Sequence, residues 1–308
     1  MFRLIGTTNI DFIGKRRVMF FLSALLVALG LFALVMIALG KANMGIDFAG
    51  GVMLQGHFEQ PVSIDLLRSK LTAEFPDVQV TELRKFEKPN AFIVKTKNPE
   101  SKVAGEDRLM RMRQILADGF PNNTFERDYT EVIGPAVGET LRDKARWAIL
   151  ISLIGILVYI GFRFDFRSGV AATVATFHDV LAVTGIFYLL NLEFDLLIVT
   201  ALLTLAGYSL TDTVVVYDRI RENLKKFRAK GEFVSTINAS INEVLSRTIN
   251  TSMTVLIVVG TLFFFGGEVL RNFSLALMLG VVVGTYSSVF VASPIVVEWE
   301  ARSPRRFK

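Results

Sequence analysis

Ionisable residues inside long apolar segments are the first candidates for chemistry in this sequence. Asp212 lies in the segment Leu196–Asn223, whose first 22 residues, up to Tyr217, are largely apolar. A helix of that length spans a hydrocarbon core of about 30 Å, where an ionised carboxylate without a partner is strongly destabilising. We therefore expect the Asp212 side chain to face protein or water and to be part of a functional site. The simpler alternative is a protonated Asp212 that only hydrogen-bonds a neighbouring helix.

Three more ionisable residues lie at a similar predicted depth. At 1.5 Å per residue, Asp212 lies about 9 Å from the end of its segment that is assigned below to the cytosol, and His178 and Asp179 lie about 13 Å from theirs. Arg247 stands at the cytosolic edge of its own segment. These groups are the parts of a proton relay, because burial favours the neutral carboxyl whereas a nearby guanidinium favours the carboxylate. We expect a movement that separates Arg247 from Asp212 to drive proton uptake.

Simpler interpretations exist for these residues too. Arg247 could extend toward the membrane surface, as long basic side chains do. His178 and Asp179 could form a hydrogen-bonded pair that fixes helix packing. Asp218 is expected to pair with Arg221 on the helix surface. At 3.6 residues per turn, a supporting polar track is predicted from Thr204, Tyr208, Ser209, Thr251 and Thr254.

The composition indicates a membrane protein with a polar insert. Of the 308 residues, 52% are hydrophobic and 26 are Phe, and the mean hydropathy is +0.46. The net charge of +5 is explained by cytosolic loops rather than by nucleic-acid binding. The absence of Cys excludes disulfides, and two His without Cys argue against a structural zinc site. Motifs of nucleotide hydrolases, serine hydrolases and zinc proteases are absent, so we expect no enzyme activity, no bound metal and no cofactor beyond a coupling ion.

Six apolar segments are predicted to cross the membrane as helices. They are Val18–Gly40, Trp147–Phe162, Val170–Leu192, Leu196–Asn223, Ile249–Phe265 and Phe273–Val297. The first exceeds the roughly 7–15 apolar residues of a signal peptide, so we expect it to remain uncleaved. The periodicity of Phe233–Leu245 predicts an amphipathic helix at the membrane surface.

Basic residues orient the chain. The two termini and the loops after the second and fourth spans contain 16 Lys and Arg residues, whereas the two short loops on the other side contain only Arg271. Short basic loops remain in the cytosol. Both termini are therefore predicted to be cytosolic, and the large insert between the first two spans is predicted to lie in the periplasm or its equivalent.

The insert, residues 41–146, has the pattern of an α+β domain. Its predicted strands are Gly51–Phe58, Val78–Phe86, Ala91–Lys97 and Thr124–Val132, and its predicted helices are Ile64–Phe75 and Asp107–Phe120. A turn at 88–90 joins the middle strands, and the order βαββαβ is that of a ferredoxin-like domain. His57 is interpreted as a surface residue rather than a ligand. The remaining chain divides into a cytosolic segment (1–17), the first span (18–40), spans two to six (147–298) and a cytosolic tail (299–308).

Glycine-containing motifs stand at both ends of this insert. MGIDFAGG at 44–51 predicts a bend in an extended segment, and IGPAVG at 133–138 predicts a turn that re-enters the membrane. The resulting hinge candidates are Gly45, Asp47, Gly50, Gly51, Gly134, Pro135 and Gly138.

Small residues recur every four positions in the last span. They are Ala276, Gly280, Gly284, Ser288 and Ala292. Such a strip lets another helix approach closely. It could be filled by a helix of this chain or by a partner.

Four motifs together resemble SecF, the smaller membrane subunit family of the bacterial SecDF complex of protein export. They are GIDFAGG (45–51), IGPAVG (133–138), GYSLTDTVVVYDRIREN (207–223) and SRTINTSMTVL (246–256). The resemblance implies one six-helix half of an RND-like transporter in the bacterial inner membrane, with a SecD-like subunit supplying the other half. It also implies that Asp212 is the family's essential intramembrane carboxylate and Arg247 its companion. Protons would pass through the interface of the two subunits, and movement of the periplasmic domains would pull the preprotein outward after the motor ATPase has acted.

The partners implied by this resemblance are the SecD-like subunit, the Sec translocation channel with its accessory membrane subunits, and translocating preproteins. Protons are the expected coupling ion, and sodium stays open. Two other functions are weighed against this one. A self-contained proton-coupled exporter of small molecules lacks an evident pocket in six spans, and a passive scaffold of the channel would not need the intramembrane polar residues.

Overall fold

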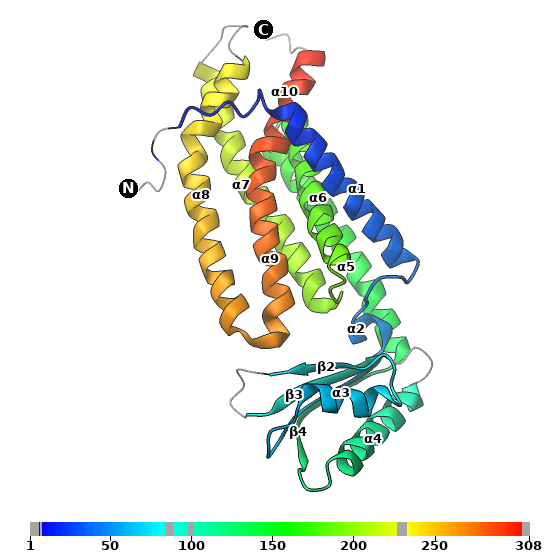
Figure 1. Ribbon diagram of the computed structural model, residues 1–308. Helices are drawn as coiled ribbons and strands as arrows, with labels where there is room; N and C mark the ends of the chain where they lie inside the picture. The colour runs from blue at the N-terminus through cyan, green and yellow to red at the C-terminus, as the bar shows by residue number, and fades with distance from the viewer. Residues whose placement is uncertain (1–5, 7, 84–88, 98–101, 227–232, 304–308) are drawn as a thin grey trace.

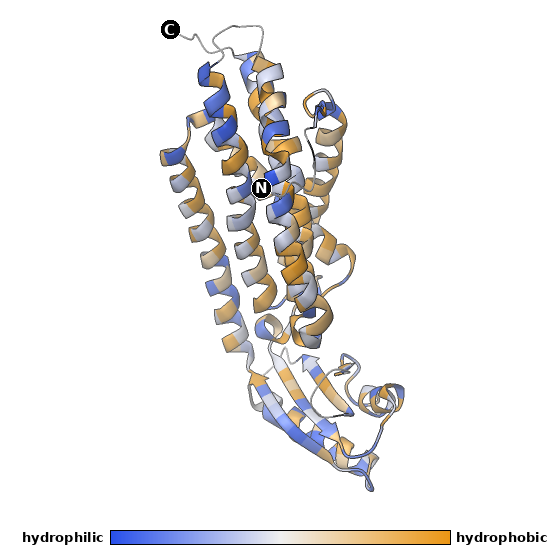
Figure 2. Cartoon of the chain, turned by 90° about the vertical axis from the view of Figure 1, so that its left-hand side faces the viewer, coloured by the Kyte–Doolittle hydropathy of each residue, from blue (hydrophilic) through white to orange (hydrophobic). Residues whose placement is uncertain are grey.

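The structure is a computed structural model that describes residues 6, 8–83, 89–97, 102–226 and 233–303. It has two parts, a long helical bundle and a small sheet domain beyond one end of the bundle (Figure 1). Hydrophobic residues dominate the length of the bundle, and hydrophilic residues gather toward its ends and in the sheet domain (Figure 2). This arrangement confirms the predicted class, a six-helix membrane protein with an α+β insert.

Six helical segments in the described ranges are long and apolar enough to cross a membrane. They are α1 (Arg16–Ala38), α5 (Pro135–Arg163), α6 (Phe166–Leu189), α7 (Leu196–Lys226), α8 (Phe233–Phe265) and the final segment Gly267–Arg302. The final segment comprises α9 (Gly267–Ser287), a π-helical turn η1 (Ser288–Ala292) and α10 (Ser293–Arg302).

The six segments divide into inner and outer helices. In their most apolar stretches, 61% of α6, 50% of α7 and 56% of the final segment are buried, against 17% of α1, 11% of α5 and 17% of α8. The centre of the bundle is therefore built by α6, α7 and the final segment. These are also the helices that carry most of the buried polar residues.

The sheet domain has the predicted βαββαβ order. Its elements are β1 (Gly51–Phe58), α3 (Ile64–Thr72), β2 (Gln79–Glu82), β3 (Ala91–Lys97), α4 (Lys102–Gly119) and β4 (Phe125–Ile133). The strands pair antiparallel in the order β2-β3-β1-β4, which is the ferredoxin-like arrangement. Helices α3 and α4 cover one face, where apolar residues of β1, β3 and both helices form one core: Leu54, Phe58, Leu67, Leu71, Val94, Met112 and Leu116.

The second membrane helix begins earlier than expected. The sequence predicts a turn at 133–138 and a span that starts at Trp147, but α5 runs without a break from Pro135, with Gly134 as its N-cap. Proline is preorganised for the first helical turn, where its missing N–H has no cost. The charged stretch before Trp147 therefore continues the helix beyond the apolar part of the segment.

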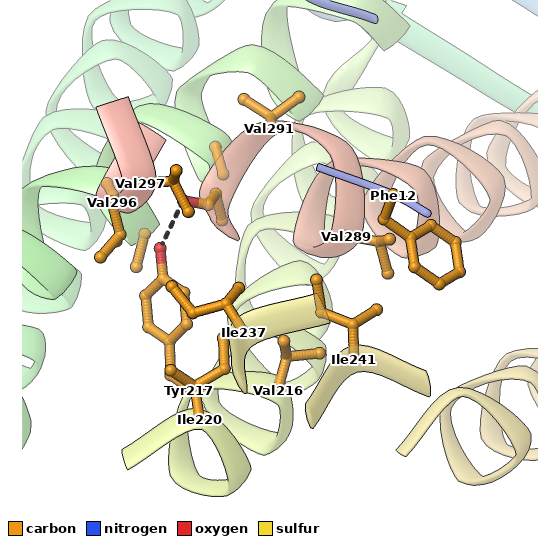
Figure 3. Close-up of a cluster of buried hydrophobic side chains, with 14 of the residues drawn as sticks. Phe12, Val216, Tyr217, Ile220, Ile237, Ile241, Val289, Val291, Val296 and Val297 are labelled. Carbon is orange, nitrogen blue, oxygen red and sulfur yellow. Dashed lines mark hydrogen bonds between the residues drawn. The ribbon is translucent and has the colours of Figure 1, made fainter. Parts of the chain in front are cut away.

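The predicted surface helix Phe233–Leu245 is wrong as a separate element. It is the first part of α8, which continues to Phe265. Ile237 and Ile241 pack inside the bundle against Val216, Tyr217 and neighbours from the final segment, as Figure 3 shows. Because this apolar face is buried by protein, it does not bind the membrane surface.

Smaller differences concern local contacts. The bend at 44–51 contains one helical turn, α2 (Ile46–Ala49), which ends at Gly50 with φ +74°. His57 lies on β1, where it faces Glu126 and Asp128. The expected pair of Asp218 with Arg221 is wrong, because Arg163 at the end of α5 donates to Asp218 at 2.6 Å. The predicted turn at 88–90 and both basic tails lie partly outside the described residues.

Candidate functional site

Asp212 lies where α7, α8 and α9 meet, and only 5% of its surface is exposed. The hydroxyls of Ser252 on α8 and Thr285 on α9 each approach its Oδ2 atom at 3.4 Å. These hydroxyls bond each other at 2.6 Å, and the Tyr208 hydroxyl donates to Ser252 at 3.2 Å. Because 3.4 Å is long for an O–H···O hydrogen bond, Asp212 is surrounded by hydroxyls but held tightly by none of them.

Asp179 lies on α6, is fully buried and has three hydrogen-bond partners. Its Oδ1 atom is 2.8 Å from Nδ1 of His178. Its Oδ2 atom accepts a hydrogen bond of 2.7 Å from Ser287 on α9 and another from Ser209 on α7. This carboxylate therefore joins three helices at the centre of the bundle.

The two carboxylates lie on different sides of the contact between α7 and α9. Helix α7 supplies Asp212 to one site and Ser209, one turn earlier, to the other. Helix α9 supplies Thr285 to the Asp212 site and Ser287 to the Asp179 site. The same pair of helices thus forms both sites, with α8 completing the Asp212 site and α6 the Asp179 site.

The small-residue strip of the last span explains how α7 and α9 approach so closely. A Cβ atom at Gly280 would lie 2.6 Å from Leu205, and one at Gly284 would lie 3.2 Å from the Cβ of Ser209. The strip is therefore filled by α7 of the same chain, at least at these glycines. The other strip residues, Ala276, Ser288 and Ala292, are buried as well, and Tyr217 on α7 donates to the Ala292 carbonyl at 2.9 Å.

Arg247 does not contact Asp212 in this structure. Its side chain is exposed, and it forms no ion pair with the described residues. It precedes Ser252 by five residues on α8, which corresponds to about 7.5 Å along the helix. Of the predicted polar track, Tyr208 and Ser209 take part in the two sites. The other three side chains, Thr204, Thr251 and Thr254, are exposed and bond carbonyls of their own helices.

Sequence reasoning missed three hydroxyl residues of the two sites: Ser252, Thr285 and Ser287. Their signal is present but local. Ser252 lies one turn after Thr248 on the buried face of α8, and Thr285 and Ser287 lie one and three residues after Gly284. The predicted track includes Thr251 and Thr254 because they follow Arg247 on one face of the helix, yet that face is exposed and points away from the bundle.

Two buried polar atoms beside Asp179 and Asp212 have no hydrogen-bond partner among the described residues, Nε2 of His178 and Oγ1 of Thr213. His178 also borders a groove of about 460 Å³ between α1 and α6, which is lined mainly by apolar side chains. Within the described residues, no group of three or more His, Cys, Asp or Glu could hold a metal ion.

The hinge candidates meet where the sheet domain joins the bundle. Asp47 on α2 accepts a hydrogen bond of 2.8 Å from the backbone N–H of Leu196, the first residue of α7. Gly138 on α5 approaches the Phe48 carbonyl so closely that a Cβ atom would lie 3.0 Å from it. Gly45 bonds Phe194, Gly50 and Gly51 lead into β1, and Gly134 and Pro135 start α5.

Charge accumulates at this junction. Burial raises the pKa of Asp195, and the neighbouring carboxylates of Glu193 and Asp47 raise it further. Burial also raises the pKa of Glu131 on β4, again with the help of Asp47. Lys95 opposes both shifts and pairs with Glu193 at 3.0 Å.

Comparison with known proteins identifies the family. The family model described as "Protein export membrane protein SecD/SecF, C-terminal" matches residues 114–302. The protein translocase subunit SecF of Thermodesulfovibrio yellowstonii is 49% identical over 301 residues, covering 96% of this chain and 97% of the relative. SecF of Vibrio alginolyticus is 40% identical over 300 residues, covering 97% and 92%.

Solved structures give the same assignment. The crystal structure of SecDF from Thermus thermophilus, described as a translocon-associated membrane protein, matches with a TM-score of 0.79 and 38% identity over 96% of this chain. The super-membrane-facing form of SecDF matches with a TM-score of 0.70 and 37% identity. The chain spans 39% and 40% of those SecDF chains. It belongs to the SecD/SecF family of protein-export membrane proteins, and its full-length relatives are SecF subunits.

Proposed function

We propose that this chain uses the proton motive force to assist protein translocation across the bacterial inner membrane, with Asp212 as the group that binds and releases the proton. The family membership supports a multi-pass subunit of the translocation machinery. The proton coupling is our inference from the site. Periplasmic domain motion, after the ATPase step of translocation, would be its output.

The observation that carries this proposal is the buried Asp212 carboxylate with two long hydroxyl contacts. Protonation turns Oδ2 from a hydrogen-bond acceptor into a donor. The hydroxyl oxygen of Ser252 or Thr285 can accept the new hydrogen bond without a rearrangement of the helices. Both forms of the carboxyl group are thus accommodated. We take a proton rather than sodium as the coupling ion, because the protonated carboxyl needs only one acceptor, and the neighbouring hydroxyl oxygens can supply it.

Arg247 would complete the cycle by approaching the ionised carboxylate after a movement of α8 against α7. The exposed guanidinium lies on the same helix as Ser252. A shift of α8 would therefore change the distance from Ser252 to Asp212 and the distance from Arg247 to Asp212 together. His178 and Asp179 would then hold α6, α7 and α9 in register, or pass the proton onward. The partnerless Nε2 of His178 is compatible with the second role.

A SecD-like partner would cover the face of α7 that this chain leaves open. Thr200, Thr204, Gly207 and Thr211 form an exposed stripe on that helix. Small and hydroxyl-bearing residues pack against other helices in membranes better than against lipid. Since SecDF chains are more than twice as long as this one, a second half docked on this stripe would bring its own groups close to Asp212.

The charge count supports cytosolic termini and a periplasmic sheet domain. Translocating preproteins would meet that domain as they leave the Sec channel and its accessory subunits. No cofactor and no enzymatic step are needed in this scheme, because the free energy comes from proton flow.

The test is preprotein translocation into inverted vesicles, with and without a proton gradient. Asp212→Asn keeps the shape but cannot bind and release a proton, so stimulation by the gradient should disappear while the protein accumulates normally. Asp143→Asn, at an exposed carboxylate of α5 paired with Arg146, is the matched control and should keep the stimulation. An Asp212→Asn variant that responds fully would leave the scaffold function standing.

Sodium coupling and the exporter function are separated by two further measurements. Replacing a proton gradient by a sodium gradient should give no stimulation. Purification in mild detergent should recover a larger SecD-like subunit, whereas a homo-oligomer alone would favour the exporter.

A further inference from the structure

Helix α2 sits between the sheet domain and the bundle and contacts both. Its residue Asp47 accepts a hydrogen bond of 2.8 Å from the backbone N–H of Leu196 at the start of α7. On another side, Arg142 of α5 donates to the Phe48 carbonyl at 2.6 Å. Directly after α2, Gly50 turns the chain with φ +74° and β1 starts at the next residue. One helical turn thus connects α7, α5 and the sheet.

The contact between Asp47 and α7 is electrostatic as well as geometric. The first N–H groups of a helix lack partners within the helix, and its N-terminus favours negative charge. Asp195 caps α7 from within its own sequence by accepting from Ile198 at 2.9 Å. Asp47 adds a second cap from a position 149 residues away. Since α7 already has a local cap, the carboxylate of Asp47 is not required to start the helix, and its effect is to attach the sheet domain to it.

Further bonds fasten the loop before α7 to the same domain. The Gly45 N–H donates to the Phe194 carbonyl at 2.7 Å, and the Phe194 N–H donates to the Asn43 carbonyl at 2.8 Å. Lys95 of β3 reaches Glu193 at 3.0 Å. The loop therefore moves with the domain, and Asp47 extends this attachment to the first residue of α7.

We propose that Asp47 is a positioning residue that couples α7 to the sheet domain, so that a displacement of α7 turns α2 and, through it, β1. The proposal rests on the proposed function, because α7 carries Asp212. The two residues are linked by a continuous helix: Leu196 precedes Asp212 by 16 residues, or about 24 Å. A continuous helix transmits a tilt or shift along its axis, and α5, bonded to α2 through Arg142, supplies the support against which α2 turns.

The experiment measures domain position in the full-length chain, reconstituted with its SecD-like partner in lipid nanodiscs. The natural absence of Cys allows spin labels at two introduced cysteines, Tyr129→Cys on β4 and Val269→Cys at the start of α9, both exposed positions. The label distance is compared between chains with Asp212 and with Asp212→Asn, which mimics the protonated form. We expect the substitution to shift the distance distribution when Asp47 is present, and the shift to be lost with Asp47→Ala.

Two additional variants separate coupling from folding. Leu196→Pro deletes the N–H that Asp47 accepts without touching Asp47, and proline is tolerated at the first helical position; it should abolish the shift as Asp47→Ala does. Asp65→Asn removes an exposed carboxylate from the first turn of α3, where it pairs with Arg68, and should keep the shift.

The outcomes distinguish this inference from the proposed function. A distance shift that persists in Asp47→Ala or in Leu196→Pro overturns the role of Asp47 and leaves proton coupling at Asp212 intact. If Asp212→Asn causes no shift even with Asp47 present, α7 does not move the sheet domain and the role of Asp47 fails, whereas proton coupling at Asp212 is decided by the translocation assay. Loss of the shift in both variants, with retention in Asp65→Asn, supports the coupling.

Discussion

Among the described residues of the bundle, the buried carboxylates Asp179 and Asp212 share α7 and α9 as neighbours but differ in how tightly they are hydrogen-bonded. Asp179 has three partners, two of them at 2.7 and 2.8 Å, whereas Asp212 has two hydroxyls at 3.4 Å. Protonation of Asp179 would disturb at least one short hydrogen bond. Protonation of Asp212 would instead create an O–H donor that a neighbouring hydroxyl oxygen can accept from. A fully satisfied buried network favours one arrangement of its helices. From this difference we infer a structural role for Asp179 and proton exchange for Asp212.

Removal of each carboxylate gives the largest expected contrast. Asp179→Ala leaves His178, Ser209 and Ser287 buried without their common acceptor, so we expect a loss of about 3–5 kcal/mol of unfolding free energy. Asp212→Ala should lose about 1 kcal/mol, because its long bonds contribute little. Denaturant unfolding in mixed micelles measures both values. Equal losses would refute the division between the two residues.

Packing between α7 and α9 supports both sites and gives the next largest effect. Gly284→Leu forces a side chain against Ser209, so we expect a loss of about 1–3 kcal/mol and reduced association with the partner. Gly260→Leu on α8 is the control, because a Cβ atom added at that position would have no neighbouring atom within 4 Å. The same unfolding assay applies, and a neutral Gly284→Leu would mean that the two helices separate easily.

Single hydroxyls sharpen the comparison further. Ser287→Ala removes one short bond to Asp179, and we expect a loss of about 1.5 kcal/mol, since hydrogen bonds to charged groups are the stronger ones. Thr285→Val at the Asp212 site should lose less, because its contact to the carboxylate is long, at 3.4 Å, and its bonds to Ser252 and to the Val281 carbonyl join uncharged groups. The reverse order in melting temperature would contradict the assignment.

Arg247 gives the smallest effect on stability and a large one on function. Its exposed side chain has no ion pair among the described residues, so Arg247→Met should change the unfolding free energy by less than about 0.5 kcal/mol. The response of translocation to the proton gradient should nevertheless be lost, and Arg247→Lys should retain part of it because the charge remains. Full activity of Arg247→Met would exclude Arg247 from the cycle.

Local patterns were enough to predict most of the fold. Apolar length predicted the six membrane helices, and the sequence pattern of the insert predicted β1 and β3 with their observed bounds. Errors arose where a local signal had two meanings. Pro135 marks a helix start as well as a turn, and the amphipathic face of Phe233–Leu245 fits a protein core as well as a membrane surface.

Sequence by itself determined that Asp179 and Asp212 lie in membrane helices, because hydropathy and helical periodicity are properties of neighbouring residues. Tertiary structure alone decided which hydroxyls reach each of them. Ser252, Thr285 and Ser287 are 40, 73 and 108 residues from the carboxylates they contact. Such contacts depend on where two helices cross and how closely they approach, and here a pair of glycines on α9 sets that approach. The hydroxyl of Ser287 lies 2.7 Å from the Asp179 carboxylate, whereas that of Thr285 lies 3.4 Å from the Asp212 carboxylate. This difference in hydrogen-bond length cannot be predicted from the periodicity of the sequence.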